Sequence, residues 1–249
     1  MEIIGPFLIC LIAGLSTVLG FLFIFIKPKD KVSFIGSSLA FSATIMLLIS
    51  IVELIPEGYI HLNNRYNLFY ASITLILMLI IGNFISKGIN KYIKKQEKIN
   101  SDLYRVGIIS MIVLMIHNLP EGIITFLAST VDIKTGIHLA VAIMMHNIPE
   151  GIAIAIPIYY ATKEKKKAFK ATFLSGLSEP VGGVIAFIFL YKFINNTMIS
   201  VILLFTAGLM ISVAINEVYN EANKYPRRSI LIGVVLASLL FIINQLLFH

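Results

Sequence analysis

The chain has 249 residues, of which 58% are hydrophobic and only 13% are Asp, Glu, Lys or Arg. Soluble domains carry about 25% charged residues, so this composition excludes an ordinary soluble fold. The net charge of +7 could suggest nucleic-acid binding, but the basic residues fall in short segments between apolar runs, and no nucleic-acid partner is expected. The single cysteine, Cys10, excludes an internal disulfide framework and a zinc–thiolate cluster.

Apolar runs of about 18 or more residues are long enough to cross a bilayer as helices. The first run resembles the core of a signal peptide, but its flank carries Glu2 rather than a basic residue, and no cleavage pattern precedes Lys27, so we interpret it as a span. The eight expected spans are residues 5–26, 34–59, 67–90, 103–127, 137–161, 168–193, 198–221 and 227–248. The connections are too short for a separate soluble domain, so residues 1–249 are predicted to form one all-α membrane domain.

The basic residues alternate between the connections. Seventeen of the twenty Lys and Arg residues lie in the first, third, fifth and seventh connections, whereas the even ones hold only Arg65, Lys134 and Lys192. The positive-inside rule therefore predicts that the odd connections are cytoplasmic and that both termini lie outside. A wrong number of spans would break this alternation, so the charges support eight.

Seven of the thirteen acidic residues lie inside the expected spans, where an ionised group costs about 2.5–3.5 kcal/mol. These seven are Glu53, Glu57, Glu121, Glu150, Glu179, Glu217 and Glu221. Two histidines, His117 and His146, lie in the same spans, and no Lys or Arg lies mid-span to pair with the acids. A metal cation or protons must therefore balance the carboxylates.

A repeated hexapeptide, H-N-x-P-E-G, occupies residues 117–122 of the fourth span and 146–151 of the fifth. Its His and Glu are four residues apart and its Asn and Glu are three apart, so all three share one helix face, with Cβ atoms about 5–6 Å apart. The proline is expected to interrupt the helix and to free a carbonyl near Ile116 or Met145. One intramembrane histidine can simply be a packing hydrogen bonder, but two matched copies on antiparallel neighbours favour a binding site near the midplane.

A third contribution is expected from Glu179, which lies mid-span in the sixth run and again precedes a proline. The small residues of Ser175-Gly176 beside it would allow close helix approach. The alternative interpretation is a protonated carboxyl group that only makes a packing hydrogen bond.

Two further pairs have E-x-x-x-E spacing, Glu53 with Glu57 in the second span and Glu217 with Glu221 in the seventh. We interpret them as vestibule carboxylates that attract cations, with Glu57 toward the outside and Glu221 toward the cytoplasm. The alternative is that they are interfacial carboxylates in contact with water. The other histidines lie at span ends or in outer segments, where solvated side chains are expected: His61, His138 and His249. Among these, His61 is the best candidate for a ligand at the outer mouth.

At these residues the sequence resembles the ZIP family of divalent metal transporters (Zrt-, Irt-like proteins), and within it the bacterial zinc-uptake branch. The resemblance spans nearly the whole chain: eight spans, outside termini, the paired H-N-x-P-E-G motifs, and the S-G-L-x-E segment of span six. One feature departs from the family. Many members have a His-rich connection between spans three and four, whereas here it is short and has no histidine, so metal sensing through it is not expected.

The resemblance implies a binuclear metal site whose glutamates bridge the two ions. The implied ligands are His117, Asn118, Glu121, His146, Asn147, Glu150 and Glu179. It also implies a 3+2+3 arrangement in which spans one to three and six to eight are inverted repeats, which the two E-x-x-x-E pairs fit. It further implies uptake into the cytoplasm across the cell membrane, and it is compatible with a homodimer in the lipid bilayer.

Imidazole, carboxylate and amide ligands without thiolate suit Zn²⁺, Fe²⁺, Mn²⁺ or Co²⁺ better than Cu⁺. The expected cargo is zinc, with iron, manganese, cobalt or cadmium as further substrates, and no catalytic cofactor is expected. Two rivals stay open, a metal exporter and an intramembrane metallo-enzyme. The enzyme fits poorly, because the chain has no H-E-x-x-H string and its H-x-x-x-E order differs from the E-x-x-H of di-iron sites.

Overall fold

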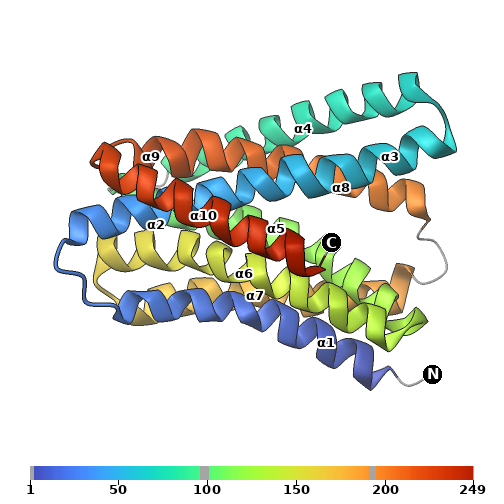
Figure 1. The fold of residues 1–249 in the computed structure, drawn as a ribbon, viewed down its shortest axis with the longest axis horizontal. Helices are drawn as coiled ribbons and strands as arrows, with labels where there is room; N and C mark the ends of the chain where they lie inside the picture. Colours follow the sequence, from blue (N-terminus) through green and yellow to red (C-terminus); the bar gives the residue numbers. More distant parts are fainter. Residues whose placement is uncertain (1–2, 96–100, 191–194, 249) are drawn as a thin grey trace.

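The computed structural model describes residues 3–95, 101–190 and 195–248, and these residues are almost entirely helical (Figure 1). The elements are α1 (Ile4–Leu15), η1 (Ser16–Phe25), α2 (Lys31–Ile49), η2 (Ser50–Leu54), α3 (Ile55–Arg65), α4 (Leu68–Lys94), α5 (Asp102–Val131), α6 (Ile133–Thr162), α7 (Lys165–Ile185), η3 (Ala186–Leu190), α8 (Asn196–Val213), η4 (Ala214–Tyr219), α9 (Asn220–Ala222) and α10 (Arg227–Phe248). Lys98, Lys192 and His249, which the sequence analysis placed in connections or at the C-terminus, lie outside the described residues.

Eight of the described helices, counted with their continuations, are long and apolar enough to cross a membrane. This confirms the predicted number of spans. Several helices extend beyond the apolar runs, because polar residues at their first turns accept hydrogen bonds from free backbone N–H groups. Asp30 and Asp132 cap α2 and α6 in this way, so these two helices begin several residues before the expected spans, and Asn67 caps α4 at the expected position.

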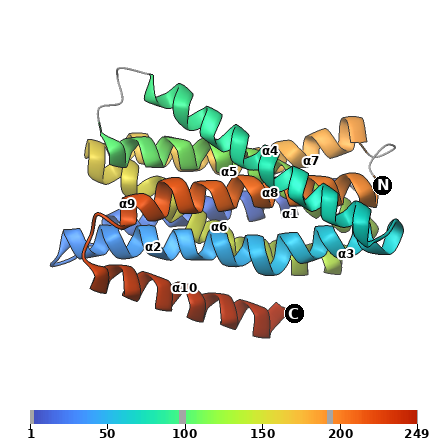
Figure 2. The same ribbon diagram turned by 90° about the horizontal axis from the view of Figure 1, so that it is seen from above.

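The helices form two groups that pack face to face (Figures 1 and 2). In the first group, α1 with η1, α5, α6 and α7 pack closely on one another. In the second, α2 packs on α10, and α8 packs on α3 and α4. The groups meet where α2 contacts α6 and where α8 contacts α5. The two helices that carry the hexapeptide motifs therefore lie in one group and face the other.

Four spans change their helical winding along their length, and the sixth does so where α7 continues into the π-helical segment η3. The first continues from α1 into the 3₁₀ helix η1. The second and seventh contain the π-helical segments η2 and η4, which hold Glu53 and Glu217. Single-turn π segments are frequent at functional sites, and the sequence pattern of apolar residues did not predict these segments.

Glycines set the closest helix contacts in the first group. A Cβ atom on Gly122 of α5 would lie 1.8 Å from the carbonyl oxygen of Glu179 on α7, and one on Gly151 of α6 would lie 1.9 Å from the carbonyl oxygen of Thr17 on η1. A Cβ on Gly176 would likewise lie 2.4 Å from the carbonyl oxygen of Gly14. The close approach predicted around Gly176 is thus confirmed, and the glycine that ends each hexapeptide has the same packing role.

Candidate metal centre

The two hexapeptide motifs lie on unbroken helices. Helix α5 runs through Pro120 and α6 runs through Pro149, so the prediction that these prolines interrupt the helix was wrong. The neighbouring helices hold each backbone in its helical path despite the lost hydrogen bond, as is common in membrane helices. The physical consequence of proline remains, because it has no N–H to donate to the carbonyl four residues earlier.

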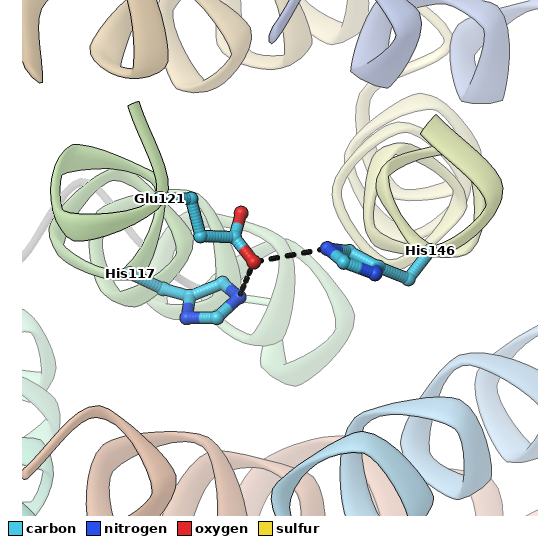
Figure 3. A group of neighbouring side chains, drawn as sticks. All are labelled: His117, Glu121 and His146. Carbon is cyan, nitrogen blue, oxygen red and sulfur yellow. Dashed lines mark hydrogen bonds and ion pairs between the residues drawn. The ribbon is translucent and has the colours of Figure 1, made fainter. Parts of the chain in front are cut away.

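Three side chains meet at the centre of the site, with Glu121 between the two histidines (Figure 3). Glu121 Oε1 lies 3.1 Å from His117 Nε2 and 2.9 Å from His146 Nε2. Possible ligand atoms of all three residues lie within 4.8 Å of one another. Ligand atoms of one tetrahedral zinc ion, each about 2.1 Å from the metal, lie about 3.4 Å apart. Small side-chain rotations would therefore admit an ion here.

Glu150 extends this group on the side of His117. Its Oε1 lies 3.3 Å from His117 Nε2, so this imidazole faces a carboxylate from each motif. Two orientations of the neighbouring Asn118 amide fit the structure. In one its nitrogen donates to Ser175 O at 3.3 Å, and in the other it donates to Leu114 O at 2.8 Å and to Glu150 Oε2 at 3.3 Å. We favour the second, because it satisfies the amide better.

The amide of Asn147 links the α6 motif to two other helices. Its Nδ2 donates to Glu179 Oε2 on α7 and to the carbonyl oxygen of Ala13 on α1, both at 2.9 Å. Glu179 is completely buried, and this bond ties it to the motif. The contacts above therefore form two sets, one of five predicted ligands around His117 and one that joins Asn147 to Glu179. The charges of Glu121, Glu150 and His117 act on Glu179, so the two sets are neighbours, and we refer to the seven residues together as the cluster.

The cluster is buried and its polar atoms are incompletely satisfied. All seven residues are buried. Buried atoms without a hydrogen-bond partner include Glu121 Oε2, Asn147 Oδ1, Glu150 Oε1 and Glu179 Oε1. Buried polar atoms in native proteins are almost always paired. Four such oxygens, from four side chains of the same cluster, are what a site for a cation would leave free.

The predicted pathway residues of the second span lie at different depths. Glu53, in η2, is half-buried, and its Oε1 accepts a hydrogen bond from Gln245 of α10 at 2.6 Å. The charge of Glu53 also acts on His146, so this carboxylate belongs to the surroundings of the centre. Glu57 and His61 are exposed on α3, and the structure does not bring them to it. His138 is also exposed, on α6.

The seventh span carries the other pair, Glu217 and Glu221, and both residues are buried. Glu217 accepts a hydrogen bond from the amide of Asn90 on α4. Glu221 pairs at 2.7 Å with Lys224, which also pairs with Asp102 at 2.9 Å. These two partners, Glu221 first, raise the pKa of Lys224 above its ordinary value. Glu221 therefore has a basic partner just beyond its span, which the search for mid-span Lys or Arg missed.

Sequence reasoning also missed Asn90 and Gln245. Each is a carboxamide near the end of an apolar span, and each donates to a glutamate of a π-helical segment. A polar amide in a hydrophobic run was the available signal, because such groups need a partner in the bilayer. The E-x-x-x-E spacing indicated the two acceptors, Glu53 and Glu217, but it carries no information on the amide donors from other spans.

Comparisons with known proteins agree with this geometry. The profile described as ZIP zinc transporter matches residues 86–240. The chain is 35% identical to zinc transporter ZupT of Streptococcus mutans over 99% of this chain and 98% of that one. It is 35% identical to ZupT of Oceanobacillus iheyensis, over 97% of both chains, and 31% identical to ZupT of Clostridium perfringens, over 99% of this chain and 97% of that one. This multi-pass membrane protein therefore belongs to the ZIP zinc transporter family, as its paired motifs indicated.

Proposed function

We propose that the chain moves zinc across the membrane, with Fe²⁺, Mn²⁺, Co²⁺ or Cd²⁺ as further substrates, through a binuclear site in the α5–α6–α7 cluster. One observation carries this proposal. Carboxylates from both motifs lie beside the imidazoles of His117 and His146, and all of these groups are buried. No Lys or Arg of the described residues pairs with these carboxylates. Because isolated buried carboxylates are strongly disfavoured, a divalent cation is the natural partner.

We assign the ligand roles by position. One ion would lie between His117, Glu121 and His146, whose ligand atoms already converge. The second would lie on the side of Glu150 and Glu179, each of which has one unpartnered oxygen. Glu121 and Glu150 would bridge the ions, since each carboxylate has two oxygens. The amide oxygens of Asn118 and Asn147 would complete the set.

The chemistry of these ligands supports transport rather than storage. Imidazole nitrogen with carboxylate and amide oxygen binds zinc and its neighbours without the tenacity of thiolates, and a transported ion must also leave. Five residues outside the cluster would then guide cations: the pairs Glu53 with Glu57 and Glu217 with Glu221, and His61 near the outer end.

The 3+2+3 arrangement with inverted repeats is also part of the proposal. In this arrangement span two corresponds to span seven, and span three corresponds to span eight. The Glu53–Gln245 hydrogen bond joins spans two and eight, and the Glu217–Asn90 hydrogen bond joins the corresponding spans seven and three. Both glutamates lie in π-helical segments. These matched features support an internal two-fold relation, which in other transporters places the substrate site at the repeat interface.

We propose that the odd connections face the cytoplasm and that the flux is uptake through the cell membrane. The connections α1–α2, α6–α7 and α9–α10 lie at one end of the bundle, and the N-terminus and the α3–α4 and α5–α6 connections lie at the other (Figure 1). The excess of Lys and Arg in the first set supports this orientation. Export is the second candidate, because the site chemistry is the same in both directions.

The test is zinc flux into proteoliposomes that contain the purified chain and a trapped zinc-sensitive dye. We expect saturable flux that competing Fe²⁺, Mn²⁺, Co²⁺ and Cd²⁺ reduce, and that is lost with Glu150→Gln. Glu164→Gln, an exposed residue of the α6–α7 connection, is the control and should leave flux unchanged. Flux that persists in Glu150→Gln would contradict the proposed site. Inside-out and right-side-out vesicles under the same gradient would distinguish uptake from export.

A further inference from the structure

A cavity lies outside the proposed metal site, where four helix ends meet. It has a volume of 460 Å³, and its walls come from the end of η1, the start of α2, the end of α6 and the start of α7. Four lysines line it: Lys27, Lys31, Lys163 and Lys165. The cavity is therefore built from two separate connections, and both bring positive charge to it.

These lysines have no acidic partner among the ion pairs of the described residues. The two acids beside them in sequence are engaged elsewhere. Asp30 accepts hydrogen bonds from the N–H groups of Val32 and Ser33 at the start of α2, and Glu164 pairs at 2.7 Å with Lys167, which is not part of the wall. The cavity thus concentrates four positive charges without an internal counter-ion, so it should attract an anion.

Two of the lysines are held in place by aromatic rings. Lys163 Nζ lies 4.8 Å from the centre of the Tyr160 ring, and Lys165 Nζ lies 4.7 Å from that of Phe25, both within cation–π range. Lys163 is also the one non-glycine residue with positive φ, 61°, in the part of the chain that the structure describes. A left-handed residue at this position reverses the chain between α6 and α7 and brings both lysines to the cavity.

The cavity lies at the level where a membrane surface is expected, since its walls are the last residues of two spans and the first residues of two others. An apolar ridge continues from it into the bilayer region. The rings of Phe25 and Phe21 lie 5.4 Å apart, those of Phe21 and Phe169 also 5.4 Å, and those of Phe169 and Phe173 5.7 Å. Phe25 and Phe169 are exposed, so an acyl chain can lie along this ridge.

We propose that this cavity binds the phosphate headgroup of an anionic phospholipid, whose acyl chain lies along the phenylalanine ridge. Basic pockets between membrane helices on the cytoplasmic side recognise such headgroups. Inorganic phosphate offers the same charge, but it would leave the ridge without a role. Because Lys31 begins α2 of the second helix group and the other three lysines flank helices of the first, the bound headgroup would join the two groups.

The binding test is native mass spectrometry of the full-length, detergent-solubilised chain with added phosphatidylglycerol or phosphatidylcholine. We expect preferential retention of phosphatidylglycerol, and the triple variant Lys31→Gln/Lys163→Gln/Lys165→Gln should weaken it about 100-fold. The matched control is Lys29→Gln/Lys166→Gln/Lys170→Gln, which removes three exposed charges from the η1–α2 connection and the first turns of α7, outside the cavity wall. It should weaken lipid binding much less than the cavity variant does.

Two further arms identify the source of the phosphate. Millimolar inorganic phosphate should fail to displace the lipid, and Phe21→Ala/Phe25→Ala should weaken lipid binding with all four lysines in place. If the two triple Lys→Gln variants lost phosphatidylglycerol binding equally, the proposal would be overturned, because the lipid would then be attracted by the general positive charge of the surface and not by the cavity. Full displacement by inorganic phosphate would overturn the lipid assignment. The triple Lys→Arg variant keeps the charge and must keep binding, so its failure to bind would also contradict the proposal.

Discussion

At the scale of single residues, Glu121 is the junction of the proposed site. It lies on α5 with His117, one turn away, yet it also reaches His146 on α6. A single carboxylate oxygen therefore faces both imidazoles, and its other oxygen has no partner among the described residues. No other acidic side chain of the cluster lies within 3.3 Å of a nitrogen from both histidines.

Replacing Glu121 with Gln should lower zinc affinity by at least about 100-fold, because it removes a negative charge that no nearby residue supplies while keeping the side-chain shape. Isothermal titration of the purified chain with Zn²⁺ measures this. Glu164→Gln serves as the control, since that residue is exposed and remote from the cluster. Unchanged affinity in Glu121→Gln would remove this residue from the site.

Zinc binding should weaken as the pH falls from about 7.5 to about 5, because in this range protons begin to compete with zinc for the imidazoles and carboxylates. The sign follows from the ligand chemistry, because His117 and His146 must be neutral and the glutamates ionised to bind metal. Equilibrium binding, rather than flux, is the proper measurement, since a proton gradient can drive transport while protons weaken binding. Tighter binding at the lower pH would be incompatible with direct histidine ligation.

At the scale of helices, the site depends on how closely α5, α6 and α7 approach one another. Gly122 and Gly151 allow the backbone of a neighbouring helix to lie where a side chain would otherwise be. The hexapeptide therefore combines proposed ligands with a packing residue: His, Asn and Glu belong to the cluster, and the glycine allows the adjacent helix to approach closely. The π-helical segments η2 and η4 make a comparable local adjustment around Glu53 and Glu217.

Gly122→Ala should destabilise the protein by about 1–3 kcal/mol and reduce zinc binding, because its Cβ would lie 1.8 Å from the carbonyl oxygen of Glu179 and would push that ligand's helix away. Thermal unfolding in detergent and zinc titration measure the two effects. The matched control is Gly88→Ala in α4, where a Cβ would meet nothing within 4 Å. It should be neutral or stabilising by up to about 1 kcal/mol. Equal effects at both glycines would show that the α5–α7 contact is unimportant.

At the scale of the whole molecule, the distribution of charge supports the orientation that we propose. The described basic connections gather at one end of the bundle, with the ion pairs between Lys224, Glu221 and Asp102 among them. The proposed metal site belongs to the first group, whereas Glu53 and Glu217 belong to the second. A relative movement of the groups would therefore change which carboxylates stand near the cluster, as alternating access requires.

Cysteines placed at Lys95 and Lys166 should react with an impermeant maleimide only from the cytoplasmic face, and one at Lys134 only from outside. All three positions are exposed, and they lie in connections of opposite predicted orientation. The background is Cys10→Ala, which removes the native thiol. Labelling of intact cells and of inverted vesicles gives the comparison. Reaction at position 95 or 166 in intact cells would reverse the proposed orientation.

The sequence by itself determined the number of spans, the all-helical class and the identity of the clustered side chains. The spans can be predicted from the summed hydropathy of consecutive residues, and residues four apart in a helix lie on the same face. Neither prediction requires information on how the helices pack. The repeat of His117–Glu121 as His146–Glu150 made the motif visible.

Only the tertiary structure decided which groups meet between helices. Glu121 with His146, Glu150 with His117, and Asn147 with Glu179 depend on the depth and crossing of three helices, which backbone contacts at glycines set. Only the structure shows that α5 and α6 continue past Pro120 and Pro149. It also shows that Glu217 and Glu221 are buried whereas Glu57 is exposed. Spacing along one helix cannot specify these outcomes, because they arise from the packing of neighbours that are distant in sequence.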